Sequence, residues 1–362
     1  MHVSRKPQIQ LLEDWLLNAK SAPLSIKLIE KNERESVLRA FEAVMRILVT
    51  SSDYWLTFDS LLPPRCHTVF QNIDFPMLTS VSLRSSGSTS TSLEMFLTAP
   101  KLVNVTLVRY HFLLVLPWEQ VRRLRKGRSS IAECLKALQQ SPHLQKCQFE
   151  GVYSSYRHIF ETIMPHDQLK DLHVALDHPL SMSLFDCITL PSLYNLNIQN
   201  NSSGSLPLFY LTSLFLRSAC NLERLTIRSL FDDKDLILCL EAIPSLTYLH
   251  LQMIGDPWEV VGLTWHLVAS LDPLSNPSRL LLPNLKYFRF KGQIFCEIRP
   301  IVDMLARRWH LSDDGGTSQN SSVSKLKLAE IFSTESYHLT ADVQEELRNL
   351  SEEGMSIRIE SC

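Results

Sequence analysis

Glycine is scarce in this sequence, with 10 residues among 362. Loops that wrap phosphate groups depend on glycine, because the backbone must approach the ligand closely there. The nucleotide signatures G-x-G-x-x-G and G-x-x-x-x-G-K-[ST] are absent, as are the metalloprotease signature H-E-x-x-H and the hydrolase signature G-x-S-x-G. We therefore expect no enzyme, no cofactor and no small-molecule substrate.

Neither sign of charge dominates, and no long apolar run occurs. The chain holds 36 Lys and Arg against 38 Asp and Glu, so nothing attracts nucleic acid or anionic lipid in general. No stretch reaches the roughly eighteen apolar residues of a membrane helix, and the start lacks the apolar segment of a secretory signal. We expect a soluble intracellular protein, cytoplasmic or nuclear, with neither a nucleic-acid nor a membrane partner.

Signs of disulfides and metal sites are also missing. The eight cysteines include no C-x-x-C pair, and Cys147 and Cys239 replace aliphatic residues in apolar patterns. This usage predicts reduced thiols in the core. His166, His173 and His178 fall in one stretch, but their spacing suits no common metal motif. We expect no metal site.

What the sequence does contain is one cassette, P-x-L-x-x-L-x-L, that returns along the whole chain. Residues 243–254 (I-P-S-L-T-Y-L-H-L-Q-M-I) show it best, with an anchor at Leu246 and further apolar residues three and five positions later, Leu249 and Leu251. The last two alternate as the inward residues of a short strand do. Seven further copies are Leu78/Val81/Leu83, Leu102/Val105/Leu107, Leu144/Cys147/Phe149, Leu169/Leu172/Val174, Leu193/Leu196/Ile198, Leu222/Leu225/Ile227 and Leu285/Phe288/Phe290.

The spacing of the anchors identifies the repeat class. Four of the seven intervals between anchors are 24 or 25 residues, which is within the range of leucine-rich repeats. Weaker copies, at Pro23/Ile26/Leu28, Asp53/Leu56/Phe58, Val121/Leu124, Val323/Leu326/Leu328 and Gly354/Ile357/Ile359, bring the total to about thirteen repeats. We predict an α/β leucine-rich-repeat solenoid, an irregular horseshoe with parallel strands on its concave face and helices on its convex face.

One solenoid over residues 1–362 is the predicted domain organisation, because each repeat packs only on its neighbours. Residues 1–60 form the N-terminal capping repeats with a helix at 33–50, residues 312–322 a flexible excursion, and residues 342–360 the C-terminal cap. Apolar periodicity predicts further helices at 8–18, from about Leu93, from about Ser130, and at 181–188, 206–219, 235–242, 258–271 and 342–350.

Several stretches together resemble the repeat region of fungal F-box leucine-rich-repeat proteins. They are L-P-W-E-Q at 116–120, F-L-R-S-A-C-N-L at 215–222, L-L-P-N-L at 281–285, Arg308-Trp309, and L-R-N-L-S-E-E-G-M at 347–355. The resemblance implies a substrate receptor of a ubiquitin ligase, whose F-box docks on the ligase adaptor while the repeats hold the substrate. No F-box opening of the L-P-x-E-(I/L) type precedes the first repeat, so we expect this chain alone not to bind the adaptor.

A partner-binding surface is predicted from the outward positions of the late strands. Tyr and Arg are typical of interface hot spots, and they gather at Arg224, Arg228, Tyr248, His250, Tyr287, Arg289 and Lys291. No acidic residue stands among the outward positions of these three strands, so we expect an acidic or phosphorylated partner segment. The alternative is a structural scaffold that acts through its convex helices.

Two other features of the sequence are explained without a binding role. Arg122, Arg123, Arg125, Lys126 and Arg128 form a basic run that suits an import signal or a nucleic-acid patch, or a solvated segment without such a role. Since no aromatic residue interleaves the run, we favour the solvated segment. Trp118, Trp258, Trp265 and Trp309 are predicted to pack within helices and turns.

Overall fold

The computed structural model describes residues 6–30, 35–85, 93–108, 114–154, 163–254, 262–275, 280–310 and 323–361. The chain forms two compact units, unit 1 (Met1–Ser129 and Lys136–Glu150) and unit 2 (Ser130–Leu135 and Gly151–Cys362). The boundary between them passes through α3 (Ile131–Gln140) and β9 (Lys146–Tyr153). The predicted excursion at 312–322 lies outside the described residues.

Unit 1 is a parallel sheet with helices and short 3₁₀ turns between its strands. Its strands lie in the order β1, β2, β3, β5, β7, β9. The elements are α1 (Lys6–Ala19), β1 (Leu24–Ile29), α2 (Glu35–Val49), η1 (Ser52–Tyr54), β2 (Trp55–Leu62), η2 (Pro64–Phe70), β3 (Ser80–Ser85), β4 (Leu93–Glu94), β5 (Asn104–Val108), β6 (Leu114–Val115), η3 (Trp118–Gln120), β7 (Arg123–Lys126) and β8 (Ser129–Ser130). Helix α2 confirms the helix predicted at 33–50.

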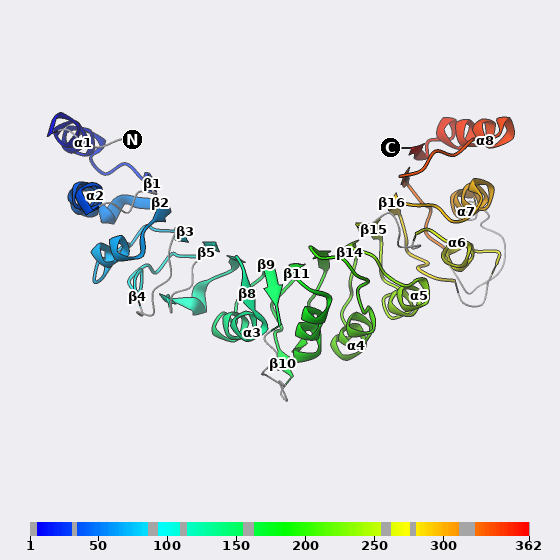
Figure 1. Cartoon of the computed structure of the whole chain (residues 1–362), viewed down its shortest axis with the longest axis horizontal. Helices are drawn as coiled ribbons and strands as arrows, with labels where there is room; N and C mark the ends of the chain where they lie inside the picture. Colours follow the sequence, from blue (N-terminus) through cyan, green and yellow to red (C-terminus); the bar gives the residue numbers. More distant parts are fainter. Residues whose placement is uncertain are drawn as a thin grey trace. The chain divides into compact units, whose positions relative to one another are not determined.

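Unit 2 repeats this plan, with an α-helix between most of its neighbouring strands. Its main strands lie in the order β11, β13, β14, β15, β16, β17, β18, all parallel, and its helices lie on one face of the sheet (Figure 1). The elements are β10 (Met164–Pro165), β11 (Asp171–Leu176), η4 (Pro179–Cys187), β12 (Ile188–Thr189), β13 (Asn195–Asn200), α4 (Phe209–Ser218), β14 (Arg224–Arg228), α5 (Asp233–Glu241), β15 (Tyr248–Gln252), α6 (Trp265–Leu271), β16 (Tyr287–Gly292), α7 (Ile298–His310), β17 (Leu328–Ser333), α8 (Ala341–Glu352) and β18 (Ser356–Ser361).

The turn before the strand explains the proline in the copies that contain it. The anchor N–H donates to the carbonyl three residues earlier, as from Leu246 to Ile243 and from Leu285 to Leu282, both at 3.1 Å. Proline two residues before the anchor is then at the second position of a turn, where its fixed φ is favourable. The anchors are buried, with Leu246 fully inaccessible to solvent.

Hydrogen bonds just after the anchor hold successive repeats in register. In most repeats, the carbonyl of the residue after the anchor accepts two N–H groups from the next repeat. The Glu223 carbonyl accepts from Thr247 and Tyr248, each at 3.0 Å, and the Thr247 carbonyl accepts from Lys286 at 2.9 Å and Tyr287 at 3.0 Å. Equivalent positions of neighbouring strands therefore lie side by side and form rows across the sheet.

The apolar positions of the eight strong copies are buried as predicted, and Leu249 and Leu251 are fully inaccessible. The structure thus has an α/β fold with parallel sheets, and the predicted cassette forms its core. The horseshoe curvature and the single solenoid over 1–362 stay predictions. In unit 1 the core is rich in aromatic rings, with Trp55 stacked on Phe58 at a centroid distance of 5.1 Å.

Two of the weaker copies were predicted in the wrong frame. In β2, Phe58 pairs with Val81 and Ser60 with Leu83, so the anchor is Trp55 rather than Asp53. This copy was misread because its anchor is the bulky Trp55 and one of its inward positions is a serine, Ser60.

In β17, Ala329 pairs with Phe288 and Ile331 with Phe290. The anchor is therefore Leu326 rather than Val323, and Leu328 points outward and is only half-buried. The inward alanine contributes little to an apolar pattern, which is why the frame was missed.

The helix predicted from about Leu93 is wrong, because Leu93–Glu94 forms a two-residue strand, β4, paired with β6. The helix predicted from Ser130 is confirmed as α3. Its first turn is a capping box, in which the Ser130 N–H donates to Glu133 Oε2 at 2.8 Å and the Glu133 N–H donates to Ser130 Oγ at 3.3 Å.

Helix α7 was not predicted, and it carries the Arg308-Trp309 pair. Arg308 is fully buried, and its guanidinium donates to the carbonyls of Leu271 and Leu281 at 2.6 Å and of Leu282 at 3.1 Å. Burial lowers the pKa of Arg308 to about 10, so the side chain remains charged at neutral pH. Trp309 is 7% exposed and confirms its predicted packing role. Arg308 therefore acts as an internal clamp that joins α7 to the end of α6 and to the turn before β16.

Candidate partner-binding face

The seven predicted site residues lie on three adjacent strands of unit 2. Arg224 and Arg228 are on β14, Tyr248 and His250 on β15, and Tyr287, Arg289 and Lys291 on β16. Along β15 and β16 burial alternates, so these side chains point away from the core. We call the nine outward positions of β14, β15 and β16 the central strand face. They are Arg224, Thr226, Arg228, Tyr248, His250, Gln252, Tyr287, Arg289 and Lys291.

The first row of this face, which runs across the three strands, consists of one arginine and two tyrosines. Arg224 pairs with Tyr248, and Tyr248 with Tyr287, in the sheet register. The Arg224 guanidinium carbon lies 4.3 Å from the Tyr248 ring centroid, and the two tyrosine rings are 6.3 Å apart at an interplanar angle of 41°. Cation–π and ring–ring contacts hold these side chains in place before any partner arrives. The row thus offers a preorganised aromatic and cationic surface.

The second row corrects the predicted charge of the site. Thr226, His250 and Arg289 form it as predicted, but the row continues to Glu330 on β17. Arg289 Nε lies 2.5 Å from Glu330 Oε2. Glu330 was missed because the misread frame of β17 assigned the neighbouring residues to the outward positions. Arg289 is therefore largely neutralised by its own sheet.

His250 is a neutral member of this row at physiological pH. Burial lowers its pKa below the ordinary value, and the charges of Arg228 and Arg289 lower it further, while Glu330 acts in the opposite direction. A neutral imidazole carries one donor and one acceptor nitrogen. His250 can therefore supply a directed hydrogen bond to a partner without adding charge.

The third row contributes two further cations. Arg228 pairs with Gln252, and Gln252 with Lys291. Arg228 is half-buried and its Nε makes no hydrogen bond with a described residue, while Lys291 is exposed. Among the described residues, neither side chain forms an ion pair with a carboxylate. An acidic group of a partner would thus find two donors here.

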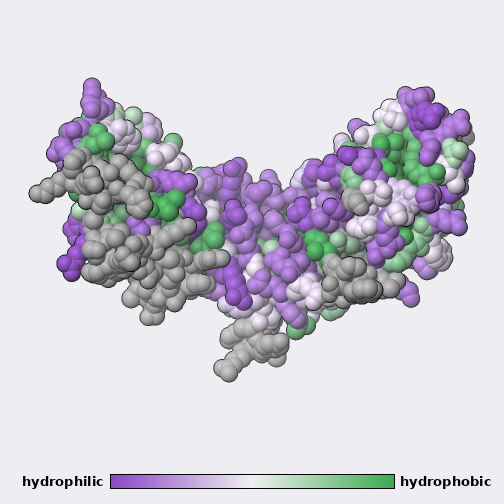
Figure 2. Space-filling view, turned by 45° about the horizontal axis from the view of Figure 1, so that its top comes forward, coloured by the Kyte–Doolittle hydropathy of each residue, from purple (hydrophilic) through white to green (hydrophobic). Residues whose placement is uncertain are grey.

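Polar and acidic residues flank the central strand face within unit 2. On the β13 side, Asn195 Nδ2 donates to Asp171 Oδ1 at 3.1 Å. On the β18 side, Arg358 Nε lies 2.7 Å from Glu360 Oε1. Hydrophilic residues cover most of the strand surface in the space-filling view (Figure 2). The cationic strip is therefore about three strands wide, roughly 10–15 Å at the usual strand spacing.

The other candidate residues do not gather into a second site on the strands. In the basic run of unit 1, Arg125 Nη2 lies 2.6 Å from Glu150 Oε1 and Lys126 Nζ donates to Ser129 at 2.9 Å. This favours the predicted solvated segment, although its role as an import signal stays a hypothesis. Trp265 is 59% exposed, contrary to the packing role predicted for it, because it begins α6 on the solvent side.

The described residues form neither a cluster of metal ligands nor a disulfide. Across the described ranges, no three His, Cys, Asp or Glu side chains come together as a metal site requires. The cysteines that the structure describes are free thiols, five of them buried, and burial raises the pKa of Cys239 to about 12. None of the helices in the described parts of the chain has the length and apolarity that a membrane crossing demands.

A comparison of the sequence with protein-family models and with curated proteins found no match. The geometry of the central strand face is therefore the basis for a functional assignment.

Proposed function

We propose that this chain is a leucine-rich-repeat interaction module, and that the central strand face of unit 2 holds an acidic or phosphorylated segment of a protein partner. The observation that carries the proposal is the first row, in which Arg224, Tyr248 and Tyr287 already contact one another in the free protein, through a cation–π contact and a tilted ring pair. Preorganised aromatic and arginine side chains lose little conformational entropy on binding, which is why they are common in hot spots.

The charge of the face selects the chemistry of the partner. Of its four cations, Arg289 is paired with Glu330, which leaves Arg224, Arg228 and Lys291 to contact the partner. Arginine forks pair with carboxylate and phosphate through two hydrogen bonds at once. A partner segment satisfies all three cations if its acidic groups reach Arg224 in the first row and both Arg228 and Lys291 in the third row.

The resemblance to F-box proteins suggests one use for such a module. In that setting the repeats would select the substrate of a ubiquitin ligase, and a separate part would dock on the adaptor. A scaffold that acts through its helices is the second candidate function, and exposed apolar side chains on α4 and α5 favour it. The two candidates use opposite faces of the sheet and are separable by mutation.

The test uses an array of matched 12-residue peptides that carry phosphoserine, aspartate or alanine at the same positions. The phosphoserine and aspartate members should bind, with affinity falling as salt rises. Replacing Tyr248 by Ala or Arg224 by Glu should each weaken binding by about 2 kcal/mol, close to 30-fold. No large change in melting temperature is expected, because both side chains are outward.

Arg289 provides a matched control for charge. Arg289→Glu alone places two carboxylates side by side with Glu330 and should weaken binding of an acidic peptide. The double variant Arg289→Glu/Glu330→Arg restores the pair in reverse order, and we expect it to recover most of the affinity. Equal binding of alanine and phosphoserine peptides, or affinity that ignores Tyr248 and Arg224, would remove the site from this face.

A further inference from the structure

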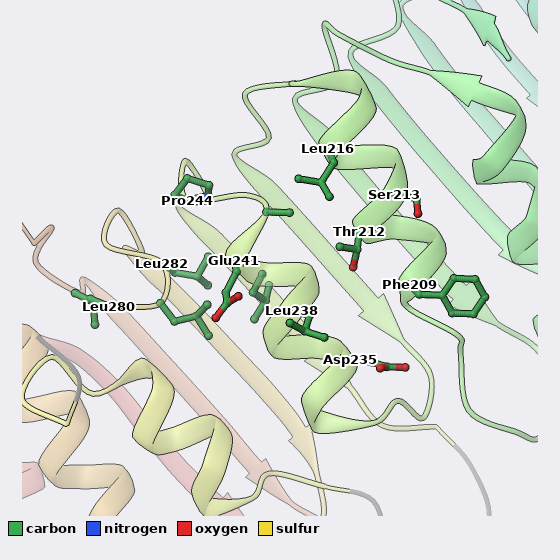
Figure 3. A pocket seen from close by; sticks show the side chains of 13 residues that line it. Phe209, Thr212, Ser213, Leu216, Asp235, Leu238, Glu241, Pro244, Leu280 and Leu282 are labelled. Atoms are coloured by element: carbon green, nitrogen blue, oxygen red, sulfur yellow. The ribbon is translucent and has the colours of Figure 1, made fainter. Parts of the chain in front are cut away.

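A second surface of unit 2 lies on the helix side of its sheet. A cavity of about 590 Å³ opens between α4 and α5, and the turn at residues 280–282 closes one end of it. Figure 3 shows Thr212 and Leu216 on α4 and Leu238 and Glu241 on α5 along its two sides. The central strand face contributes no residue to this cavity.

The cavity concentrates apolar surface that solvent can reach. Phe209, Leu216 and Leu238 line it and are 55%, 69% and 55% exposed. Single exposed apolar residues are ordinary on protein surfaces, whereas several around one groove are typical of binding sites. The floor and end wall are also apolar, through Leu240 and Leu282.

Two of the described residues that line the groove carry a charge, and both are acidic. They are Asp235 and Glu241 on α5. They are six positions apart on a helix that rises about 1.5 Å per residue, so they lie roughly 9 Å apart along the groove. A ligand with an apolar face and positive charges at its flanks complements this arrangement.

Two occupants from the chain itself fit less well. In a symmetric pair of copies the same patch meets itself, so Asp235 and Glu241 would face acidic groups of their own kind. Helix α1 exposes Leu11 and Trp15, which are 61% and 50% exposed, but Asp14 lies between them. Its charge would oppose that of the groove.

We propose that the α4–α5 groove binds an amphipathic helix of a partner protein, with the apolar face of that helix in the groove and Lys or Arg beside Asp235 and Glu241. Recognition of this kind uses apolar anchors at positions i, i+4 and i+7 of the bound helix. Helix α4 has ten residues and is about 15 Å long, which matches the two turns that these anchors span. This site is independent of the proposed strand-face function.

The experiment is a selection from a displayed library of 16-residue helical peptides against the full chain. Leu or Phe is fixed at the three anchor positions, and each flanking position is either Lys or Glu. We expect enrichment of peptides with Lys at the flanks. A synthetic copy of an enriched peptide, followed by fluorescence anisotropy, should bind at least tenfold more weakly to Leu238→Asp and to Asp235→Lys.

Controls separate this site from the strand face and from misfolding. Leu238 is more than half exposed, so its variant should keep the melting temperature of the parent chain. Tyr248→Ala should bind the peptide as the parent does. The inference is overturned by enrichment of Glu-flanked peptides, by no enrichment over a library with scrambled anchors, or by binding that Tyr248→Ala removes and Leu238→Asp spares. It is also overturned if light scattering shows a dimer that Leu238→Asp dissolves.

Discussion

The frame of the β17 repeat can be tested with two leucines that are two residues apart. Leu326 is fully buried, whereas Leu328 is half-buried and points to the opposite side. The Lys327 N–H donates to the Lys286 carbonyl at 2.8 Å, the bond that follows the anchor in the neighbouring repeats. We therefore expect Leu326→Ala to destabilise the protein far more than Leu328→Ala does.

The expected magnitudes follow from burial. A Leu→Ala change at a fully buried site removes transfer free energy and leaves a cavity, and costs about 2–5 kcal/mol. At Leu328 only part of the side chain leaves water on folding, so we expect about 1 kcal/mol or less. Leu249→Ala, at the equivalent of an inward position in a strong copy, should match Leu326→Ala and serves as the reference.

The measurement is urea unfolding followed by circular dichroism, with the free energy of unfolding taken from the midpoint and slope. Similar losses at Leu326 and Leu328, or a larger loss at Leu328, would show that the frame read from the sequence was right. The outward position of Glu330 would then be lost as well.

Three further predictions concern single residues. Arg308→Lys keeps the charge but cannot supply the fork that contacts three carbonyls, and should lower the free energy of unfolding by about 2 kcal/mol or more; an unchanged melting temperature contradicts the clamp. The folded-state pKa of His250 lies below its ordinary value, so the unfolded chain takes up a proton first and stability falls as pH drops below about 6.5. His250→Gln should flatten the dependence of unfolding free energy on pH in that window, and parallel profiles would count against it. Asp232 Oδ1 accepts the N–H groups of Lys234 and Asp235 at the start of α5, so Asp232→Ala should cost about 1 kcal/mol in thermal unfolding, whereas Asp232→Asn should cost little.

The repeats were predicted correctly where each position of the cassette is filled by its usual residue type. Proline and the anchor leucine close the turn, and the next two apolar residues enter the core, so the eight strong copies could be placed within a residue. The frame of a repeat was misread where an unusual residue occupies an anchor or inward position. Trp55 fills the anchor position of β2 and Ser60 enters the core beside it, and in β17 Ala329 occupies an inward position, so the local apolar pattern is weak at both.

The candidate site was likewise predicted in part. The rows of the central strand face followed from the spacing of anchors, and Arg224, Tyr248 and Tyr287 lie together as predicted. Glu330 was missed because its frame was misread, and the charge of Arg289 was therefore overestimated. The α4–α5 groove could not be predicted from the cassette, because it arises from side chains of neighbouring helices and from the turn at 280–282.

The central claim is that the central strand face of unit 2 holds an acidic or phosphorylated partner. The most direct measurement is quantitative mass spectrometry of proteins retained from a cell extract by the parent chain, by Tyr248→Ala/Tyr287→Ala and by Trp265→Ala. Trp265→Ala is the matched control, since it removes an exposed aromatic ring from the helix side. We predict that acidic or phosphorylated proteins retained by the parent chain and by Trp265→Ala are lost from the double tyrosine variant. Their retention by the double tyrosine variant, or their loss from Trp265→Ala alone, would contradict the claim.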